Sequence, residues 1–340
     1  MTEAVLSPRA LNRALLARQG LLERSPDPLP RMLERMAGLQ AQYAPSMYIG
    51  LWSRLAGFER AALTRALEAR EVIQATLMRS TIHLVSAEDF WPLARATREA
   101  RRTSWLRATQ GDPPEVAVEA AAAKVRAALA GSATLRRKEI EALIGKAEAR
   151  AVGLWVDLVR APPSGTWERR RADLYALAED WIGPADVEPD AAAEHLVRRY
   201  LGGFGPATAK DVASFTGLPP RDLAPVLDRL ELRRFGELLD LPDGPLPDPD
   251  TPAPVRFIPT WDASLLVHAR RTGILPEEHR PKIFHVKAPQ SYPTFLVDGA
   301  VAGTWRHEKG RIDLSPFGRL DAADRRALEA EAERLAAFHA

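Results

Sequence analysis

The sequence predicts a helix-rich α+β protein with three tandem winged-helix (helix-turn-helix) units followed by a β-rich C-terminal portion. Segments with helical apolar spacing, each followed by a short strand pair, recur over the first three-quarters of the chain. A proline-dense acidic stretch then interrupts this pattern, and strand-like segments dominate beyond it. The expected division is residues 1-90, 91-185 and 186-242 for the three units, 243-254 for a linker and 255-340 for the β-rich portion.

The first unit is expected to contain three helices and a strand pair. "SPRALNRALLARQGL", "LPRMLERMAGL" and "FERAALTRALEAR" have apolar residues at helical spacing, and Ser7 is the expected N-cap before Pro8. "VIQATLM" and "TIHLVS" are predicted to be short strands around a turn at Arg79 and Ser80.

The second and third units repeat this order. "PEVAVEAAAAKVRAALA" and "TLRRKEIEALIG" predict two helices, and "LWVDLVRAPPSGTWERRRADLYAL" predicts a strand, a Pro-Pro-Ser-Gly turn and a basic return strand. In the third unit Thr208 and Asp211 form a capping-box pattern, Gly217 marks a sharp turn, and the next helix leads to a hairpin turning at Gly236.

The last quarter of the chain begins with "LPDGPLPDPDTPAP", which we expect to be an unpacked linker because it is acidic and dense in proline. "VRFIPTWDASLLVHAR" and "KIFHV" with the segment from "PTFLVDG" to "IDLSPF" predict strands. Asp298 and Gly299 form a strong tight-turn signal. "DAADRRALEAEAERLAAFHA" predicts a closing helix.

Composition excludes several classes of protein. The chain has no cysteine, so disulfide frameworks, thiolate zinc sites and cysteine nucleophiles are excluded. No run approaches the roughly 18 apolar residues of a membrane span, and the N-terminus lacks the apolar core of a signal peptide. We therefore expect a cytoplasmic protein that does not contact a membrane.

The net charge is only +2, but the arginines are clustered in "RATREARRTSWLR", "RRK" and "RRR". Such clusters in a nearly neutral chain are typical of a basic face that binds a polyanion such as nucleic acid. They are also typical of solvated helix faces paired with glutamates. Charge alone leaves both interpretations open.

Two glutamines stand one residue apart in "GLQAQYAPSMYIGLW". The preceding helix should end near Gly38, and the residue before Pro45 favours extended geometry, so the intervening chain is expected to be extended. Side chains alternate along extended chain, which places Gln40 and Gln42 side by side on one face. On a continuous helix the two amides would point about 200° apart.

Paired amides suit a particular kind of hydrolysis. Glutamine does not titrate near neutral pH, so it is a poor general base, but it both donates and accepts hydrogen bonds and can position a water molecule. That is sufficient only where the leaving group is already good. A guanine alkylated at N7 is cationic and meets this condition. The alternative is that both glutamines cap the carbonyls at the end of the helix.

The sequence resembles the AlkZ-like family of bacterial winged-helix DNA glycosylases, relatives of the azinomycin-resistance glycosylase. The family's glutamine–aliphatic–glutamine motif matches Gln40-Ala41-Gln42, followed by "GLWSRL". The resemblance continues through "LMRSTIHLVSAEDFW", "FIPTWDASLLVHARR" and "PTFLVDGAVAGTWR", and so covers nearly the whole chain. It implies three winged helices around duplex DNA and excision of N7-alkylated purines, with unhooking of interstrand crosslinks in some members. It also assigns the catalytic roles to Gln40 and Gln42, which places the chain in the glutamine–glutamine branch.

Further residues are candidates for the same site. Arg79, Thr81 and His83 stand on alternate positions and could all face it, although a hydrogen-bonded core role is common for a histidine on an apolar strand. Asp262 is the nearest carboxylate candidate for stabilising an oxocarbenium ion, and capping of the helix after it is the alternative. The histidines lack metal-ligand spacing, so we expect no metal and no cofactor.

The basic runs provide candidate DNA contacts. Those expected to bind phosphates, without sequence preference, are Arg136, Arg137 and Lys138 at the start of a helix and Arg169, Arg170 and Arg171 after the second wing. Tyr292, in "KAPQSYP", could touch DNA from a hairpin tip, or lie in an ordinary exposed loop. We expect a monomeric glycosylase that acts on double-stranded DNA carrying alkylated bases. The alternative is a non-enzymatic winged-helix DNA-binding protein such as a transcription regulator, which usually needs a dimer interface.

Overall fold

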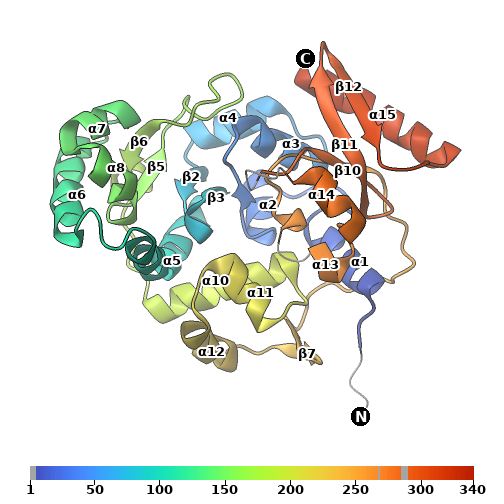
Figure 1. Ribbon diagram of the computed structural model, residues 1–340, viewed down its shortest axis with the longest axis horizontal. Helices are drawn as coiled ribbons and strands as arrows, with labels where there is room; N and C mark the ends of the chain where they lie inside the picture. Colours follow the sequence, from blue (N-terminus) through green and yellow to red (C-terminus); the bar gives the residue numbers. More distant parts are fainter. Residues whose placement is uncertain (1–4, 267–268, 285–289) are drawn as a thin grey trace.

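A computed structural model of the protein describes residues 5–266, 269–284 and 290–340. It confirms a mixed, helix-rich α+β chain. In Figure 1 the green segments lie at one end of the molecule, the red segments at the other, and the yellow segments along a third side. Among the described residues, no helix is long and apolar enough to cross a membrane.

The first part of the chain folds as expected, with one additional helix. The Ser7 side chain accepts a hydrogen bond from Ala10 N at 3.1 Å and caps the first helix, as its position before Pro8 predicts. The additional helix follows the two glutamines and begins at Ala44. The elements are α1 (Pro8–Arg18), α2 (Leu29–Arg35), β1 (Leu39–Gln40), α3 (Ala44–Arg54), α4 (Arg60–Glu68), β2 (Val72–Thr76), the 3₁₀ turn η1 (Met78–Ser80) and β3 (Ile82–Ser86).

The second part contains the two expected helices and a further long one. The expected basic return strand is wrong in one respect, because the "RRR" run precedes the strand Leu174–Leu177 and lies in the loop between the two strands. The elements are α5 (Ala87–Ala108), α6 (Glu115–Leu129), β4 (Leu135–Arg136), α7 (Arg137–Ile144), α8 (Lys146–Ala151), β5 (Leu158–Arg160), β6 (Leu174–Leu177) and α9 (Ala178–Ile182).

One antiparallel sheet joins the first two parts of the chain. Its strand order is β1-β3-β2-β5-β6-β4, so the three strands of the first expected unit continue directly into the three strands of the second within one sheet. The junction is the pairing of Ala75 in β2 with Val159 in β5, and both residues are buried in the largest core cluster. The sequence led us to expect two separate wings. The assignment of the units as three winged helices, and the domain boundaries, stay predictions.

Helix α5 packs along the helix α10 (Pro189–Phe204), and charged contacts fix the pair. Asp89 near the start of α5 is buried and accepts hydrogen bonds from His195 at 2.7 Å and Arg199 at 3.0 Å. The arginine run on α5 is used within the protein. Arg98 pairs with Asp157 at 2.7 Å, and Arg101 donates to the carbonyl of Thr76 at 2.7 Å. Both side chains are therefore engaged in contacts within the protein and are not free to bind a polyanion, although their charge alone had left that interpretation open.

The third part of the chain matches its expected pattern. Thr208 and Asp211 form the predicted capping box, and Gly217 ends the helix in the left-handed region at φ 79°. Gly236 turns the hairpin, with φ 60°. The elements after α10 are α11 (Ala209–Thr216), α12 (Pro220–Arg229), β7 (Arg233–Phe235) and β8 (Leu238–Asp240).

The proline-dense stretch forms no regular element, but it is not unpacked. Arg9 and Arg13 of α1 donate to the carbonyls of Pro249 and Thr251 at 2.8 and 2.7 Å, which ties the stretch to the N-terminal helix. The predicted β-rich portion is confirmed as a four-stranded antiparallel sheet, ordered β12-β11-β10-β9, with the turn at Asp298. Its elements are β9 (Arg256–Ile258), α13 (Ala269–Thr272), α14 (Arg280–Ile283), β10 (Thr294–Val297), β11 (Ala300–Glu308), β12 (Arg311–Pro316) and α15 (Ala322–His339).

Candidate active site and nucleic-acid interface

The two glutamines meet at the edge strand β1. Ala37 and Gly38, with φ 59° and 77°, turn the chain sharply after α2, so that Ala37, not Gly38, takes the first left-handed position. Gly38 has no room for a side chain, because a Cβ there would lie 2.9 Å from Val85 Cγ1. The extended geometry that follows confirms the expected alternation. Gln40 Nε2 donates a hydrogen bond to Gln42 Oε1; Gln40 is buried and Gln42 is exposed.

A third amide, which the sequence analysis missed, holds the peptide between them. Gln74 on β2 is 1% exposed, and its Nε2 lies 3.3 Å from the carbonyl oxygen of Ala41, to which it donates. Gln74 Oε1 is buried without a partner in the described part of the chain. The signal was available in the sequence, because Gln74 is the lone amide in the apolar segment "VIQATLM".

Arg79 extends the amide pair into a chain of hydrogen bonds. Its Nη2 donates to Gln40 Oε1 at 3.3 Å, and its Nη1 donates to the carbonyl of Phe215 at 2.7 Å. The guanidinium lies 4.6 Å from the centre of the Phe215 ring. Burial lowers the pKa of Arg79 to about 10, so it remains a cation at neutral pH.

Arg79 reaches this position from a turn and not from a strand. It has φ 54° and ψ 22°, and Ser80 has φ 56°, so two consecutive residues with side chains occupy the left-handed region. Residues held in this region cluster at functional sites. The predicted turn at Arg79 and Ser80 is therefore confirmed, and it is from this turn that Arg79 contacts Gln40.

His83 is the cross-strand partner of Gln40, so the two side chains project on the same face of the sheet. It is 1% exposed, and its Nδ1 lies 3.0 Å from the carbonyl oxygen of Thr81. Burial, and then the charge of Arg79, lower the pKa of His83 to about 3, so it is neutral at pH 7. Thr81 donates its hydroxyl to Met78 O at 3.1 Å.

Asp262 is occupied by structural contacts. One carboxylate oxygen accepts from Ser264 N at 3.0 Å as a cap, and the other pairs with Arg54 at 2.8 Å. Both side chains of the pair are essentially inaccessible to solvent. The structure brings Asp262 to α3 and shows no contact between it and the paired amides.

The two predicted basic runs lie together. Arg136 and the three arginines of the β5–β6 loop line one cleft of about 330 Å³, which they share with Ser164 and Asp173. Asp173 takes up part of the charge, because it lies 3.5 Å from Arg136 Nη1 and 2.8 Å from Arg171 Nε. Of the other two predicted contacts, Lys138 is exposed and Arg137 pairs with Glu141 at 2.8 Å.

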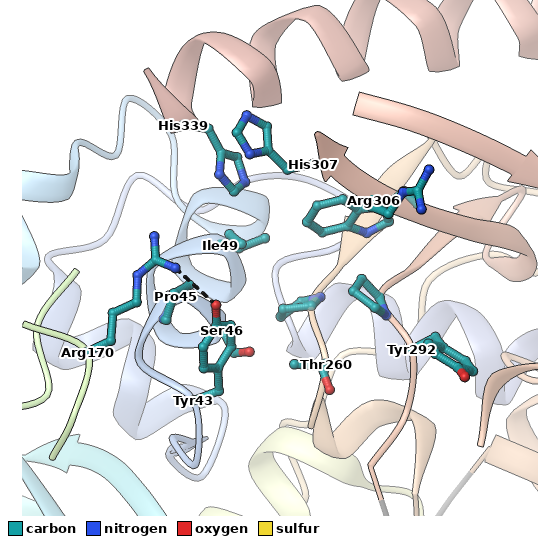
Figure 2. A pocket seen from close by; sticks show the side chains of 13 residues that line it. Tyr43, Pro45, Ser46, Ile49, Arg170, Thr260, Tyr292, Arg306, His307 and His339 are labelled. Atoms are coloured by element: carbon teal, nitrogen blue, oxygen red, sulfur yellow. Dashed lines mark hydrogen bonds between the residues drawn. The ribbon is translucent and has the colours of Figure 1, made fainter. Parts of the chain in front are cut away.

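A second pocket of about 350 Å³ shares Arg170 with this cleft. Tyr43, next in sequence to Gln42, lines it and accepts a hydrogen bond from Arg170 Nη1 at 3.3 Å. Figure 2 shows these two residues on one side of the pocket, with Tyr292 and Arg306 on the other. Planar groups and cations therefore surround a space that begins one residue from the amide pair.

Tyr292 follows Ser291, which forms an isolated antiparallel bridge with Phe284. Its backbone N–H donates to Ile283 O at 2.7 Å, and its side chain is 47% exposed. The predicted tip residues Lys287, Ala288 and Pro289 lie outside the described residues. The pocket also contains His307 and His339, whose rings stack at 4.1 Å. Burial lowers the pKa of His339 to about 4.

The described part of the chain has no group of three or more histidines or carboxylates that could hold a metal ion. Two of the histidines for which the sequence shows no metal-ligand spacing, His268 and His285, lie outside the described residues.

The family match identifies the protein as a DNA glycosylase. The chain belongs to the AlkZ-like family, because the family model described as "DNA glycosylase AlkZ-like" matches residues 33–338. A similar curated protein is the interstrand DNA cross-link repair glycosylase of Streptomyces sahachiroi, which is 24% identical over 94% of this chain and 93% of its own length. A similar solved structure is the DNA glycosylase AlkZ of the same organism. It has a TM-score of 0.82 at 20% identity, and the match covers 99% of this chain and 97% of that one.

Proposed function

We propose that the protein is a monofunctional glycosylase that hydrolyses the N-glycosidic bond of N7-alkylated purines in duplex DNA, including bulky adducts and interstrand crosslinks, and leaves an abasic site. The observation that carries the proposal is the hydrogen-bond chain from Arg79 through Gln40 to Gln42. This chain of hydrogen bonds ends at the exposed amide of Gln42. The next residue, Tyr43, contacts Arg170, which lines the arginine-rich cleft. The curated relative, named as a crosslink repair glycosylase, supports the extension to crosslinks.

The direction of these hydrogen bonds suggests a role for each of the three residues. Arg79 holds the Gln40 oxygen, which leaves Gln40 Nε2 directed at Gln42 and orients the Gln42 amide toward solvent. A water molecule bound to Gln42 is then held for attack on C1′ of the damaged nucleotide. Because Arg79 is itself cationic, it does not stabilise an oxocarbenium ion, and its contribution is to orient Gln40.

The proposed step needs no strong acid or base. The water oxygen bonds to C1′ as the bond to the purine nitrogen breaks, and the departing electron pair neutralises the cationic alkylated base. The water proton passes to solvent. In the described part of the chain, the hydrogen-bond partners of the paired amides are each other and the guanidinium of Arg79, and none is a carboxylate. This arrangement fits a substrate whose leaving group is already activated.

The arginine cleft supports DNA binding through phosphates, which is independent of sequence and suits lesions at scattered positions. We propose that a monomer places its helix–hairpin units as winged helices around the duplex. The alternative is a non-enzymatic winged-helix regulator. The family match and the curated relative favour the enzyme.

The test is single-turnover excision from a duplex containing one N7-methylguanine, with wild type beside Gln40→Ala and Gln42→Ala. Loss of one positioned hydrogen-bonding group should reduce the rate on the order of 10²-fold, as for other preorganised donors. The matched control is Gln110→Asn, at an exposed amide with φ 54°, a conformation that asparagine tolerates. Background rates for wild type, on this lesion and on a bulky N7 adduct, would refute the proposal.

A further inference from the structure

A separate pocket lies on the far side of the turn that carries Arg79. It has a volume of about 250 Å³ between the end of the β2–β3 hairpin and helices α7 and α8. Its polar lining consists of hydroxyls and guanidinium groups, and no carboxylate of the described residues lines it. The lining groups used below are Thr76, Ser80, Arg137, Arg150, Arg160 and Tyr175.

Arg160 lines this pocket as a buried cation without an anion. It is 8% exposed, and both of its Nη atoms lie 3.4 Å from the Thr76 hydroxyl. The side chain of Tyr175 also contacts the guanidinium, with the ring centre 5.4 Å away, so the partners named for Arg160 in the described part of the chain are hydroxyl-bearing and uncharged. Its Nε is buried and has no hydrogen-bond partner in the described part of the chain. Burial lowers the pKa of Arg160, and the opposing influence comes from Tyr175, not from a carboxylate.

Two other buried arginines of this protein each have a carboxylate partner. Arg18 pairs with Asp240 at 2.7 Å and Arg54 with Asp262 at 2.8 Å, and all four of these side chains are inaccessible to solvent. A buried charge with no counter-charge is costly, which is why buried cations are normally paired. Arg160 departs from this rule at a place where a pocket is available to receive an anion.

The surroundings raise the positive potential at this end of the hairpin. Arg101, also buried, donates to the carbonyl of Thr76, the residue whose hydroxyl Arg160 contacts. At the rim, Arg150 and Ser80 are exposed, so an anion can enter from solvent. Arg137 is also at the rim, and its charge is shared with Glu141. Three arginines and several hydroxyls thus converge on one small space.

We propose that this pocket binds a phosphate group, with Arg160 at its base and Arg150 and Ser80 at its entrance. A tetrahedral oxyanion matches the guanidinium fork and the hydroxyl donors, and it fits the volume. The group comes either from the backbone of bound DNA or from a free phosphate-containing molecule. Only the first source rests on the proposed function. The site is distinct from the arginine cleft, with which it shares no lining residue.

The first arm of the test measures binding of inorganic phosphate by titration calorimetry, at ionic strength held constant with chloride. Wild type is compared with Arg160→Gln and with Arg150→Gln, an exposed position whose substitution does not endanger folding. Loss of one charge-assisted contact should weaken phosphate binding on the order of tenfold to a hundredfold. The control is Arg326→Gln, at an exposed arginine on α15 outside the pocket, which should bind phosphate as wild type does.

The second arm measures affinity for undamaged duplex against salt concentration. If the phosphate belongs to DNA, Arg150→Gln should reduce the slope of log K against log salt by about 0.9. If phosphate binds but the slope is unchanged, the ligand is a free phosphate-containing molecule. Absence of phosphate binding by wild type, with no change of slope, overturns the inference. Excision of N7-methylguanine is followed separately, so failure of the proposed function would leave the phosphate result standing.

Discussion

Arg170 donates a hydrogen bond to the hydroxyl of Tyr43 at 3.3 Å, and this contact joins the basic loop to the residue that follows the second glutamine (Figure 2). The two residues are 127 positions apart in the chain. Phosphate contacts made by the loop would therefore fix the position of the duplex relative to the amide pair. In the proposed function, this pair of side chains would link the DNA-binding loop to the amide pair.

Replacement of Arg170 by glutamine should weaken binding to undamaged duplex and reduce the slope of log K against log salt by about 0.9, since one phosphate contact is lost. Arg170→Lys should retain most of the slope, because it keeps the charge. Both are measured by fluorescence anisotropy over a salt series. An unchanged slope for Arg170→Gln would show that this arginine binds no phosphate and contributes only its hydrogen bond to Tyr43.

Replacement of Arg79 by lysine should slow excision about ten- to a hundredfold, the effect of losing one charge-assisted hydrogen bond at the site. Lysine keeps the charge but lacks the fork that reaches both Gln40 and Phe215. Single-turnover excision is compared with binding to undamaged duplex and with thermal unfolding. A loss of stability with the rate unchanged would make Arg79 a purely structural bridge to α11.

Replacement of Asp262 by asparagine separates the two roles considered for this carboxylate. Asparagine can still accept from Ser264 N, but it leaves the buried Arg54 cation unpaired, which should destabilise the fold by about 3–5 kcal/mol. Excision by the folded variant should stay within a few-fold of wild type. Stability is measured by urea unfolding at a temperature where the variant is folded. A large loss of excision rate with normal stability would show that Asp262 acts in catalysis.

Acid should destabilise the protein through His83. The pKa of this side chain in the folded protein is about 3, against an unfolded value of 6.5, so the unfolded chain binds the extra proton first. The stability contributed by neutral His83 is complete above pH 6.5 and is lost as the pH falls toward 3, by up to about 1.4 kcal/mol per pH unit. Urea unfolding between pH 7 and 5 measures this, and His83→Asn should flatten the dependence.

The rate of excision should be independent of pH near neutrality. The paired amides do not titrate, and the pKa values of about 3 for His83 and about 10 for Arg79 lie outside the range between about pH 6 and 8. Single-turnover rates on N7-methylguanine provide the measurement, and at each pH they are divided by the rate of spontaneous loss of the same base, because the N1–H of this base itself titrates near neutrality. A bell-shaped profile would mean that an acid or base acts in the chemical step.

Short-range sequence signals predicted several features of this structure. The Thr208–Asp211 capping box, the turn at Asp298 and the meeting of Gln40 with Gln42 each depend on residues within four positions of one another, so a single sequence specifies them. The pairing of Gln40 with Gln42 could be predicted because the chain between a helix end and a proline is extended, and side chains alternate along an extended chain.

Contacts between distant segments were not predictable in this way. Helices α5 and α10 were missed because their charged residues obscure the apolar stripe, and Asp89 has its partners on α10. Arg101 looked like a surface cation, but it is buried against Thr76. The sequence marks Gln74 as an unusual amide on an apolar strand, but nothing local in it reports that the partner is the peptide of Ala41, or that Arg136 shares a cleft with the second basic run.

The pairing of Ala75 with Val159 limits how this protein could have been assembled during evolution. Strand β2 has a neighbour on each side, one from its own hairpin and one from β5. A chain ending after the first unit would expose an unpaired strand edge, and such edges recruit other chains. Inheritance of the first 90 residues as an independent module is therefore disfavoured, and the smallest exchangeable piece includes both units, the first of which contains the two glutamines.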